Sequence, residues 1–365
     1  MKERLTILSE CDTRIIKIDP NNIDTEALKE CAEVLKNGGL VCFPTETVYG
    51  LGASAFNEKA VENIFKAKGR PNDNPLIVHI SDYEMLPLVT CCTGEQTERL
   101  MKLGNEYWPG PLTMIADRDS AVPETVSCGL KTVGIRMPEH PVARKLIELA
   151  GVPVAAPSAN LSGKPSPSQA RHVIEDLKGR VDVIIDGGDC RVGVESTVLD
   201  ITSEEPMILR PGAVTLEDVK KVLGAGGQCD WRRGVKEGET PRSPGMKYTH
   251  YSPEAEVIMY EGDNELVKRN IKIAAMSCLL KGEKVGVMTV DENAAFYDMM
   301  PNVLSLGSRE DSLSQASNLF RLLREFDERG VAKVFAEALP TGGVGDAVMN
   351  RLYRACGGNI VNCDG

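Results

Sequence analysis

Residues 39–80, GLVCFPTETVYGLGASAFNEKAVENIFKAKGRPNDNPLIVHI, contain the pattern that decides the fold. The apolar run at 40–43 predicts a short buried strand, which ends at Pro44 because proline has no N–H for the strand ladder. The spacing of apolar residues predicts a helix over 60–68, and a second strand follows at 76–80. This order of strand, turn, helix and strand is typical of an α/β protein.

The turn after the first strand carries polar groups suited to ligand binding. Thr45, Glu46 and Thr47 place two hydroxyls and a carboxylate at the end of the strand, where α/β sheets commonly hold ligands. Gly50 and Gly52 permit a close approach of the backbone. The sequence therefore predicts a binding site at this edge of the sheet.

The helix at 60–68 ends in a basic segment that has two interpretations. Lys66, Lys68 and Arg70 interact favourably with the negative end of any helix, whether or not they bind a ligand. The rigid, amide-rich turn at 71–75 that follows favours the alternative, an anion-binding site. His79, on the next strand, is by itself more typical of a hydrogen-bonded structural residue than of a catalyst.

Two later residues are further candidates for binding anions. Arg136 lies just before a proline at the end of a predicted strand, and its planar fork suits a carboxylate. Ser166 is followed by proline, and the pattern predicts that it caps a helix whose free N–H groups can hold phosphate oxygens. Plain surface charge and ordinary capping are the alternative interpretations of these two residues.

The remaining pattern predicts two α/β domains joined by a linker. The length of 365 residues favours two domains over one core. We predict the first domain over 1–223, a linker over 224–253 that folds back as a lid, and a second domain over 254–365. In the first domain, strands are expected at 14–19, 112–116, 131–137, 152–157, 181–186, 198–201 and 208–210, and helices at 25–36, 82–90, 94–107, 140–150 and 215–223.

The second domain alternates strands and helices in the manner of a small Rossmann-like sheet. Its Thr341–Gly345 segment (TGGVG) lacks the full spacing of a dinucleotide-binding motif, so a tight turn is favoured over a nucleotide site.

Composition places the chain among ordinary globular proteins of a reducing compartment. The net charge is −11, so the chain as a whole repels RNA phosphates. Its 11 cysteines lack paired CxxC spacing, which indicates free thiols and no zinc site. The N-terminal segment lacks the apolar core of a signal peptide, and no run reaches membrane-spanning length. We expect a cytoplasmic protein with no membrane partner.

Six ordered segments resemble the YrdC-like threonylcarbamoyl-AMP synthases. They are FPTETVYGLG, KAKGRPNDNPLIVHI, WPGPLT, VGIRMP, APSAN and GVESTV, and PGMKYTHYSP at 244–253 extends the likeness to the longer members of the family. The resemblance implies a twisted mixed sheet surrounded by helices in the first domain and a Rossmann-like second domain. It also implies a nucleotidyltransferase that makes threonylcarbamoyl-AMP from L-threonine, bicarbonate and ATP, with Mg²⁺ held through the phosphates.

The resemblance also implies a role for individual residues. Lys68 and Arg70 are expected to act electrostatically on phosphate, with no covalent protein nucleophile. The expected L-threonine site contains Thr47, His79, Arg136, Ala156 and Ser196. The expected ATP site contains Arg70, Asn74, Thr132, Ser158, Ser166, Arg210 and Tyr248.

The sequence leaves two alternative functions open. One is a carbamoyl-AMP-forming enzyme of the hydrogenase-maturation type, although the cysteine-rich zinc motifs of those proteins are missing here. The other is a non-catalytic RNA-binding module, which the acidic net charge disfavours. The family resemblance implies a downstream tRNA threonylcarbamoyl transferase complex as partner and leaves direct contact with tRNA open.

Overall fold

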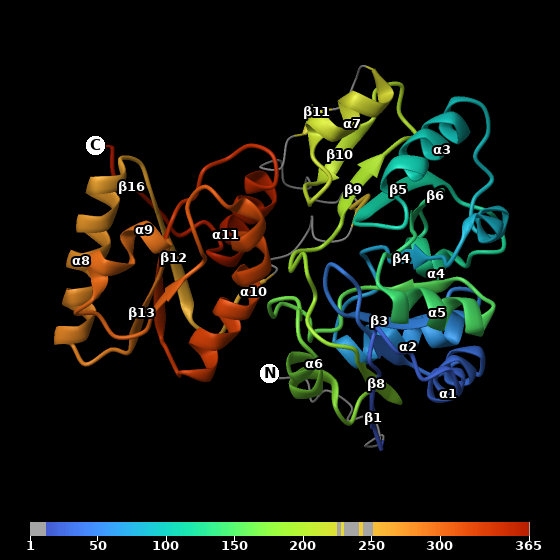
Figure 1. Ribbon diagram of the computed structural model, residues 1–365, viewed down its shortest axis with the longest axis horizontal. Coiled ribbons are helices and arrows are strands. Elements are labelled where there is room, and N and C mark those ends of the chain that lie inside the picture. Colours follow the sequence, from blue (N-terminus) through green and yellow to red (C-terminus); the bar gives the residue numbers. More distant parts are fainter. Residues whose placement is uncertain (1–11, 225–227, 230–240, 244–250, 365) are drawn as a thin grey trace.

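The computed structural model describes residues 12–224, 228–229, 241–243 and 251–364. It has two domains side by side, each built around its own sheet, with the first domain at the right of Figure 1 and the second at the left. The prediction of two α/β domains is confirmed.

Among the described residues, the first domain contains a mixed sheet of 11 strands in the order β1-β8-β2-β3-β7-β4-β6-β5-β9-β10-β11. Parallel and antiparallel neighbours alternate irregularly along it. Its strands are β1 (Arg14–Lys17), β2 (Val41–Phe43), β3 (Gly50–Ser54), β4 (Ile77–His79), β5 (Leu112–Asp117), β6 (Thr132–Arg136), β7 (Val154–Ala156), β8 (Val183–Asp186), β9 (Thr197–Asp200), β10 (Met207–Arg210) and β11 (Gln228–Cys229).

Amphipathic helices cover this sheet, and their apolar faces join one continuous core. Local sequence determines where several of them begin and end, as in the helix Glu58–Lys68, where Asn57 caps the start and Gly69 adopts the left-handed conformation at the end. The helices are α1 (Thr25–Lys36), α2 (Glu58–Lys68), η1 (Tyr83–Leu88), α3 (Glu95–Tyr107), α4 (Glu124–Ser127), α5 (Pro141–Ala150), α6 (Ala170–Leu177) and α7 (Leu216–Leu223).

Two features of the first sheet differ from the sequence-based expectation. The segment Gly50–Ser54 forms β3, which pairs antiparallel with β2, although its glycines read as part of a turn. The Cβ of any other residue at Gly52 would lie 2.6 Å from the Phe43 ring, so a strand fits here only without a side chain. β11 extends the sheet into the segment predicted as linker, by parallel pairing with β10.

The second domain has a parallel sheet of five strands in the order β14-β13-β15-β12-β16. Its strands are β12 (Glu256–Glu261), β13 (Val285–Thr289), β14 (Val303–Ser305), β15 (Lys333–Glu337) and β16 (Ile360–Asn362). Its helices are α8 (Asn264–Leu280), α9 (Asp291–Ala294), η2 (Ala295–Tyr297), α10 (Ser312–Glu328) and α11 (Gly345–Ala355).

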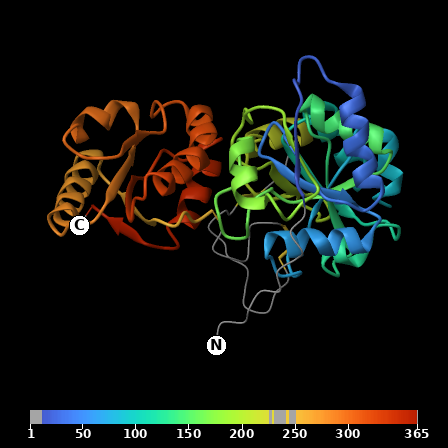
Figure 2. The same cartoon turned by 90° about the horizontal axis from the view of Figure 1, so that it is seen from below.

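The helices of the second domain lie on both faces of its sheet. α8 packs on the outer face, whereas α10 and α11 lie between the sheet and the first domain (Figures 1 and 2). Two separate apolar clusters on the two sides of the sheet match this arrangement. The inner cluster includes Val48, Val192 and Val194 of the first domain, so the two domains share part of one core.

Polar contacts also join the domains. The Arg324 guanidinium on α10 is 4% exposed and donates to the Asp176 carboxylate at 2.7 Å and to the Pro165 carbonyl at 2.6 Å. Gly193 has a φ of 77°, and a Cβ built on it would lie 2.4 Å from the Cα of Ser317 on α10. The domains therefore meet backbone to backbone at this glycine.

Within the described part of the chain, no helix is both long and apolar enough to cross a membrane.

Candidate active site

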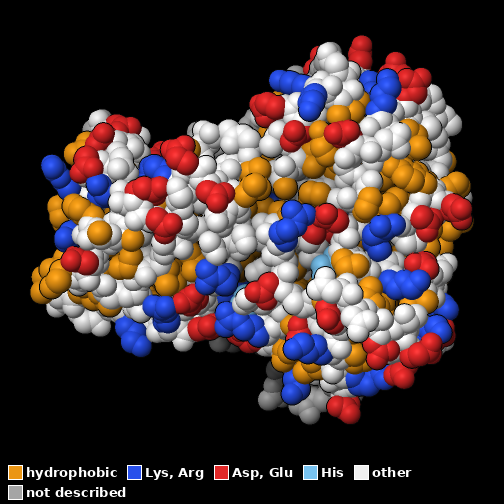
Figure 3. Space-filling view, in the orientation of Figure 1, with side chains coloured by type: hydrophobic (Ala, Val, Ile, Leu, Met, Phe, Trp, Pro, Cys, Tyr) orange, Lys and Arg blue, Asp and Glu red, His pale blue; other side chains and the backbone are white. Residues whose placement is uncertain are grey.

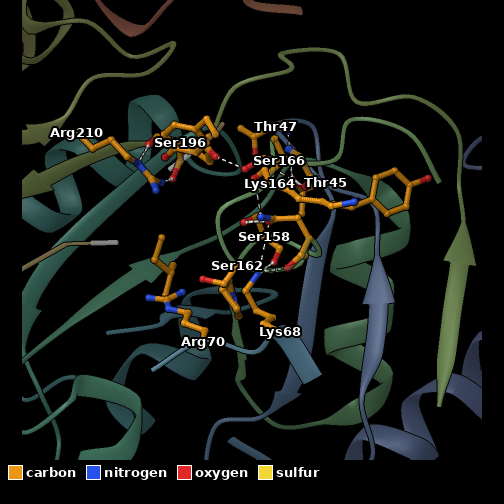
Figure 4. Close-up of a pocket in the computed structure, with 18 of the residues that line it drawn as sticks. Thr45, Thr47, Lys68, Arg70, Ser158, Ser162, Lys164, Ser166, Ser196 and Arg210 are labelled. Carbon is orange, nitrogen blue, oxygen red and sulfur yellow. Dashed lines mark hydrogen bonds between the residues drawn. The ribbon is translucent and has the colours of Figure 1, made fainter. Parts of the chain in front are cut away.

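One pocket in the first domain collects most of the predicted site residues. It encloses an empty volume of about 730 Å³, part of it open to solvent. Figure 4 shows Lys68 and Arg70 on one side and Arg210 with Ser196 on another. The predicted residues that line it are Thr47, Lys68, Arg70, His79, Arg136, Ser158, Ser166, Ser196 and Arg210.

The turn between β2 and β3 forms one wall of this pocket. Thr45 holds the turn, because its hydroxyl donates to the Val48 carbonyl at 2.6 Å and accepts from the N–H of Thr47 and of Val48 at 3.2 Å. The hydroxyls of Thr45 and Thr47 are 2.8 Å apart. Thr47 is thus presented to the pocket by a fully hydrogen-bonded turn.

Arg136 and His79 lie side by side at the ends of two neighbouring parallel strands. They are register partners on β6 and β4. The Nη2 of Arg136 donates to Oε1 of Glu46 at 2.6 Å, and its Nε donates to the Gly110 carbonyl at 3.3 Å. Both charged side chains are buried. Among the described residues Nη1 has no hydrogen-bond partner, so it is the part of the fork left for a ligand.

The His79 imidazole is neutral in this site. Burial, with Arg136 nearby, lowers the pKa of His79 to about 3. Its Nδ1 lies 3.2 Å from the Ile77 carbonyl. A neutral ring suits a hydrogen-bonding and shape-determining role beside the cationic Arg136, and not a role as a charged clamp.

We expect His79 to make the protein less stable in acid. The unfolded chain takes up a proton near the ordinary pKa of about 6.5, whereas the folded site resists protonation down to about 3. The free energy of unfolding should therefore fall as the pH falls from about 6.5 towards 3. In His79→Gln this dependence should be weaker, as measured by urea unfolding at several pH values.

His172 provides the matched control for that measurement. It is buried on α6, outside the pocket, and burial with Arg324 nearby also lowers its pKa to about 3. His172→Gln should flatten the pH dependence in the same way but leave threonine binding unchanged. Equal slopes for wild type and both variants would contradict this assignment.

Lys68 is buried at the end of α2 inside a ring of oxygen atoms. Its Nζ donates to the Ser158 carbonyl at 2.6 Å, to the Asn160 carbonyl at 2.5 Å and to the Asn160 side-chain oxygen at 3.3 Å. Burial, with Arg70 nearby, lowers the pKa of Lys68 to about 7, and the three acceptors favour the charged form. Lys68 therefore joins α2 to the loop after β7.

The loop after β7 is organised around Asn160. Ser158 Oγ donates to the Asn160 side-chain oxygen at 2.5 Å. The Asn160 amide nitrogen donates to the carbonyls of Leu161 and Lys164, at 2.8 and 2.9 Å. Asn160 therefore fixes both Ser158 and the loop that brings Lys164 to the pocket.

Three predicted residues, Asn74, Thr132 and Ala156, do not line the pocket. Asn74 is fully buried, and its carbonyl accepts from Arg70 at 2.7 Å, while both atoms of its side-chain amide have no hydrogen-bond partner. Thr132 lines a separate small cavity under β4 and β6. Ala156 is buried at the end of β7, beside β4.

Ser196 and Arg210 form another wall of the pocket. Ser196 Oγ lies 2.8 Å from the Thr113 hydroxyl and accepts from Arg210 Nη2 at 3.1 Å. Arg210 Nε donates to the Ser196 carbonyl at 3.1 Å. The two residues therefore form one rigid unit at the ends of β9 and β10.

The prediction that Ser166 caps a helix is wrong. Helix α6 begins at Ala170, and its N-cap is Gln169. Ser166 is instead fully buried, and its hydroxyl donates to the Glu195 carboxylate. The proline-rich loop is held by this tertiary contact, which overrides the local capping signal.

Glu195 is a pocket residue that the sequence reasoning did not select. Burial opposes its ionisation, but Arg351 and Arg210 outweigh that effect and hold the pKa of Glu195 below its usual value. Its position within GVESTV, one of the segments that carried the resemblance, was the available signal. Other lining residues that were not selected are Asn160, Ser162, Lys164 and Tyr251, whereas Thr45 belongs to the polar turn that the sequence indicated.

The described parts of the linker contact both domains. Arg242 pairs with Asp200 on β9 at 2.5 Å, and the Ser252 N–H donates to the Gly163 carbonyl at 2.9 Å. Tyr251, with a φ of 67°, lines the pocket. Tyr248, predicted to contact the nucleotide, lies outside the described residues.

The glycine-rich turn in the second domain already has a carboxylate in place. The Gly342 N–H donates to the Asp346 side chain at 3.0 Å, just before α11. A negative group at this position favours the tight-turn interpretation over a phosphate site.

Comparisons with known proteins identify the two-domain fold and its pocket as those of an enzyme of the nucleotidyltransferase type. A family model described as "Telomere recombination" (Sua5/YciO/YrdC) matches residues 33–212, and one described as "Threonylcarbamoyl-AMP synthase, C-terminal domain" matches residues 214–357. The chain belongs to the threonylcarbamoyl-AMP synthase family, in its two-domain form.

Relatives over nearly the full length support this assignment. The chain is 46% identical to the threonylcarbamoyl-AMP synthase of Pyrococcus abyssi, covering 93% of this chain and 96% of that one. It is also 46% identical to the enzyme of that name from Bacillus subtilis, covering 92% and 94%. The P. abyssi Sua5 structure complexed with L-threonine superposes with a TM-score of 0.88 at 45% identity, covering 96% and 99%.

Proposed function

We propose that this chain makes L-threonylcarbamoyl-AMP and pyrophosphate from L-threonine, bicarbonate and ATP. The product would serve threonylcarbamoyl-adenosine formation next to the tRNA anticodon, through a downstream transferase complex. The observation that carries the proposal is a single pocket in which Thr47, His79 and Arg136 lie beside the cations Lys68, Arg70 and Arg210. A solved relative is described as a complex with L-threonine.

The threonine end of the pocket would recognise a free amino acid. The Nη1 of Arg136 would bind the carboxylate, with the rest of the guanidinium held by Glu46 and Gly110. Thr47 and Ser196 would supply hydroxyls, and the neutral His79 would complete the wall. The threonine amine condenses with bicarbonate, releases water and becomes a carbamate.

The cationic end of the pocket would stabilise the transferred nucleotide. A carbamate oxygen attacks the α-phosphorus of ATP, a new P–O bond forms, and the bond to pyrophosphate breaks. Lys68, Arg70 and Arg210 would neutralise the charge on the phosphates and the leaving pyrophosphate, so catalysis rests on positioning and electrostatics. No protein nucleophile is required.

Magnesium enters this proposal as part of the MgATP substrate. Among the described residues, no three His, Cys, Asp or Glu side chains gather into a metal-binding group. We propose that the ion would be coordinated by the phosphate oxygens of ATP and by water.

The cellular setting is also part of the proposal. The described cysteines are all free thiols, as in a reducing cytoplasm.

On the face in Figure 3, basic and acidic side chains are interspersed, so this face has no uniform basic surface for tRNA. Membership of an enzyme family sets aside the alternative of a non-catalytic RNA-binding module.

A product assay tests the proposed reaction. With radiolabelled bicarbonate, we expect label in an AMP-linked product only when threonine and ATP are both present, together with equimolar pyrophosphate. Release of pyrophosphate without threonine would contradict the assignment. So would formation of a labelled AMP-linked product when ammonia replaces threonine. Serine in place of threonine controls for the side-chain methyl and should react more slowly by about 10-fold or more.

A further inference from the structure

We propose that Arg351 of the second domain is a positioning residue of the active site. It fixes the carboxylate of Glu195 and, through it, the hydroxyl of Ser166 and the loop that carries Ser196. This inference rests on the proposed function and assigns the second domain a defined part in it.

The contacts of Arg351 reach across the domain boundary. Its side chain lies on α11 and is 0% exposed. Nε donates to the Glu195 carboxylate at 3.0 Å and Nη2 to the Glu195 carbonyl at 3.3 Å. Nη1 donates to the Pro211 carbonyl. One guanidinium thus holds both ends of the segment 195–211, which contains β9, β10 and the pocket residues Ser196 and Arg210.

Glu195 passes this constraint to a second loop. One of its carboxylate oxygens accepts from Arg351, and the other accepts from the Ser166 hydroxyl. Ser166 lies fully buried in the loop after β7. The pocket walls formed by 162–166 and by 195–196 are therefore linked through one carboxylate, whose orientation depends on a residue of the other domain.

Arg351 also contacts the returning linker. Its Cζ lies 5.9 Å from the centre of the Tyr251 ring, and that ring packs on Phe320 of α10 with centroids 5.0 Å apart. Tyr251 lines the pocket. Three separate segments of the pocket wall thus meet at this guanidinium.

A role in domain attachment alone does not account for this placement. Arg324 pairs with Asp176 across the boundary, and the exposed Arg171 pairs with Glu328 at 2.7 Å. Arg351 differs because its partner, Glu195, is itself a pocket residue. Its planar fork matches the two acceptors of Glu195 and the Pro211 carbonyl, and a lysine cannot reproduce that geometry.

The test compares Arg351→Met, Arg351→Lys and Arg171→Gln in the full-length protein. In Arg351→Met we expect kcat/KM for product formation to fall on the order of 100-fold, because misplacement of binding groups by about 1 Å has that effect. The Arg351→Lys variant keeps the positive charge, so its kcat/KM should lie between that of Arg351→Met and that of the wild type. Arg171→Gln, which removes an exposed interdomain ion pair, should keep wild-type activity.

A double-mutant cycle shows whether Arg351 acts through Glu195. We expect Arg351→Met combined with Glu195→Gln to be no less active than the worse single variant, because both changes break one linkage. Effects that multiply would overturn the proposal. So would a folded Arg351→Met with wild-type kcat/KM, or an Arg171→Gln variant as impaired as Arg351→Met. If the methionine variant does not fold, the lysine variant and its combination with Glu195→Gln carry the same test.

Binding measurements separate this inference from the proposed reaction. Calorimetric titration of each variant with ATP alone and with threonine alone reports pocket geometry whether or not product forms. We expect weaker ATP binding in the Arg351 variants, since Ser166 and Arg210 both lose their constraint. Unchanged ATP and threonine binding in folded Arg351 variants would overturn the inference, whereas absence of product from wild type would overturn only the proposed function.

Discussion

Replacing Arg136 by alanine is expected to remove most threonine binding and to affect ATP binding far less. Its unpartnered Nη1 is the group proposed to hold the substrate carboxylate. Removing one partner of a buried, hydrogen-bonded charge pair costs about 2–5 kcal/mol of binding free energy. The threonine Kd should therefore rise by roughly 100-fold. Isothermal titration with threonine and, separately, with ATP measures the two effects.

The same substitution leaves the Glu46 carboxylate buried without its partner, since Glu46 is 4% exposed and accepts from Arg136 at 2.6 Å. Removing one member of a buried pair destabilises a protein by about 3–5 kcal/mol. The double variant Arg136→Ala, Glu46→Gln should recover much of that stability without recovering threonine binding. Equal losses of threonine and ATP affinity in the double variant would contradict the clamp role.

Replacing Lys68 by methionine should reduce kcat for product formation by more than about 100-fold. Its ammonium joins α2 to the loop containing Ser158 and Asn160, and it is a cation proposed to face the phosphates. Removing one electrostatic donor from a preorganised site typically costs about 10²–10³ in kcat. Steady-state release of pyrophosphate, measured with saturating threonine, bicarbonate and ATP, gives the comparison.

Lys66 supplies the matched control on the same helix. Its side chain is 47% exposed, and its Nζ lies 3.6 Å from the Glu62 carboxylate. An exposed ion pair contributes about 0–1 kcal/mol to stability, so Lys66→Met should keep near wild-type activity and stability. A Lys66 variant as inactive as the Lys68 variant would show that the general basicity of this helix, and not the buried ammonium, is what matters.

The fold was predictable because the spacing of apolar residues and the positions of capping and turn residues indicate the same helices and strands along most of the chain. Helix 25–36 was predicted with its observed bounds, and the second domain alternates as its parallel sheet requires. The strand Gly50–Ser54 was missed because glycines usually disfavour strands. Here the Phe43 ring and β7 fill the space that side chains would need.

Most residues of the candidate site could be predicted, but the interactions that hold them in place could not. Thr47, His79 and Arg136 lie far apart in sequence and were placed in one pocket by resemblance, and the structure brings them together. Glu195 and Arg351 were not found, because their importance comes from a pair formed across 156 residues. The Ser166 prediction failed for the same reason. Its hydroxyl could cap a helix locally, but it binds the distant Glu195 carboxylate instead.

Gly193 sets a limit on how substrates and products can enter and leave. It fits against the main chain of α10 with no room for a methyl group, and the buried Arg324 and Arg351 pairs lie at the same boundary. Swinging the domains apart during each turnover would expose two desolvated arginines and their carboxylates at once. We therefore expect substrates to enter and products to leave while the two domains remain in contact, with no opening of the domain interface during turnover.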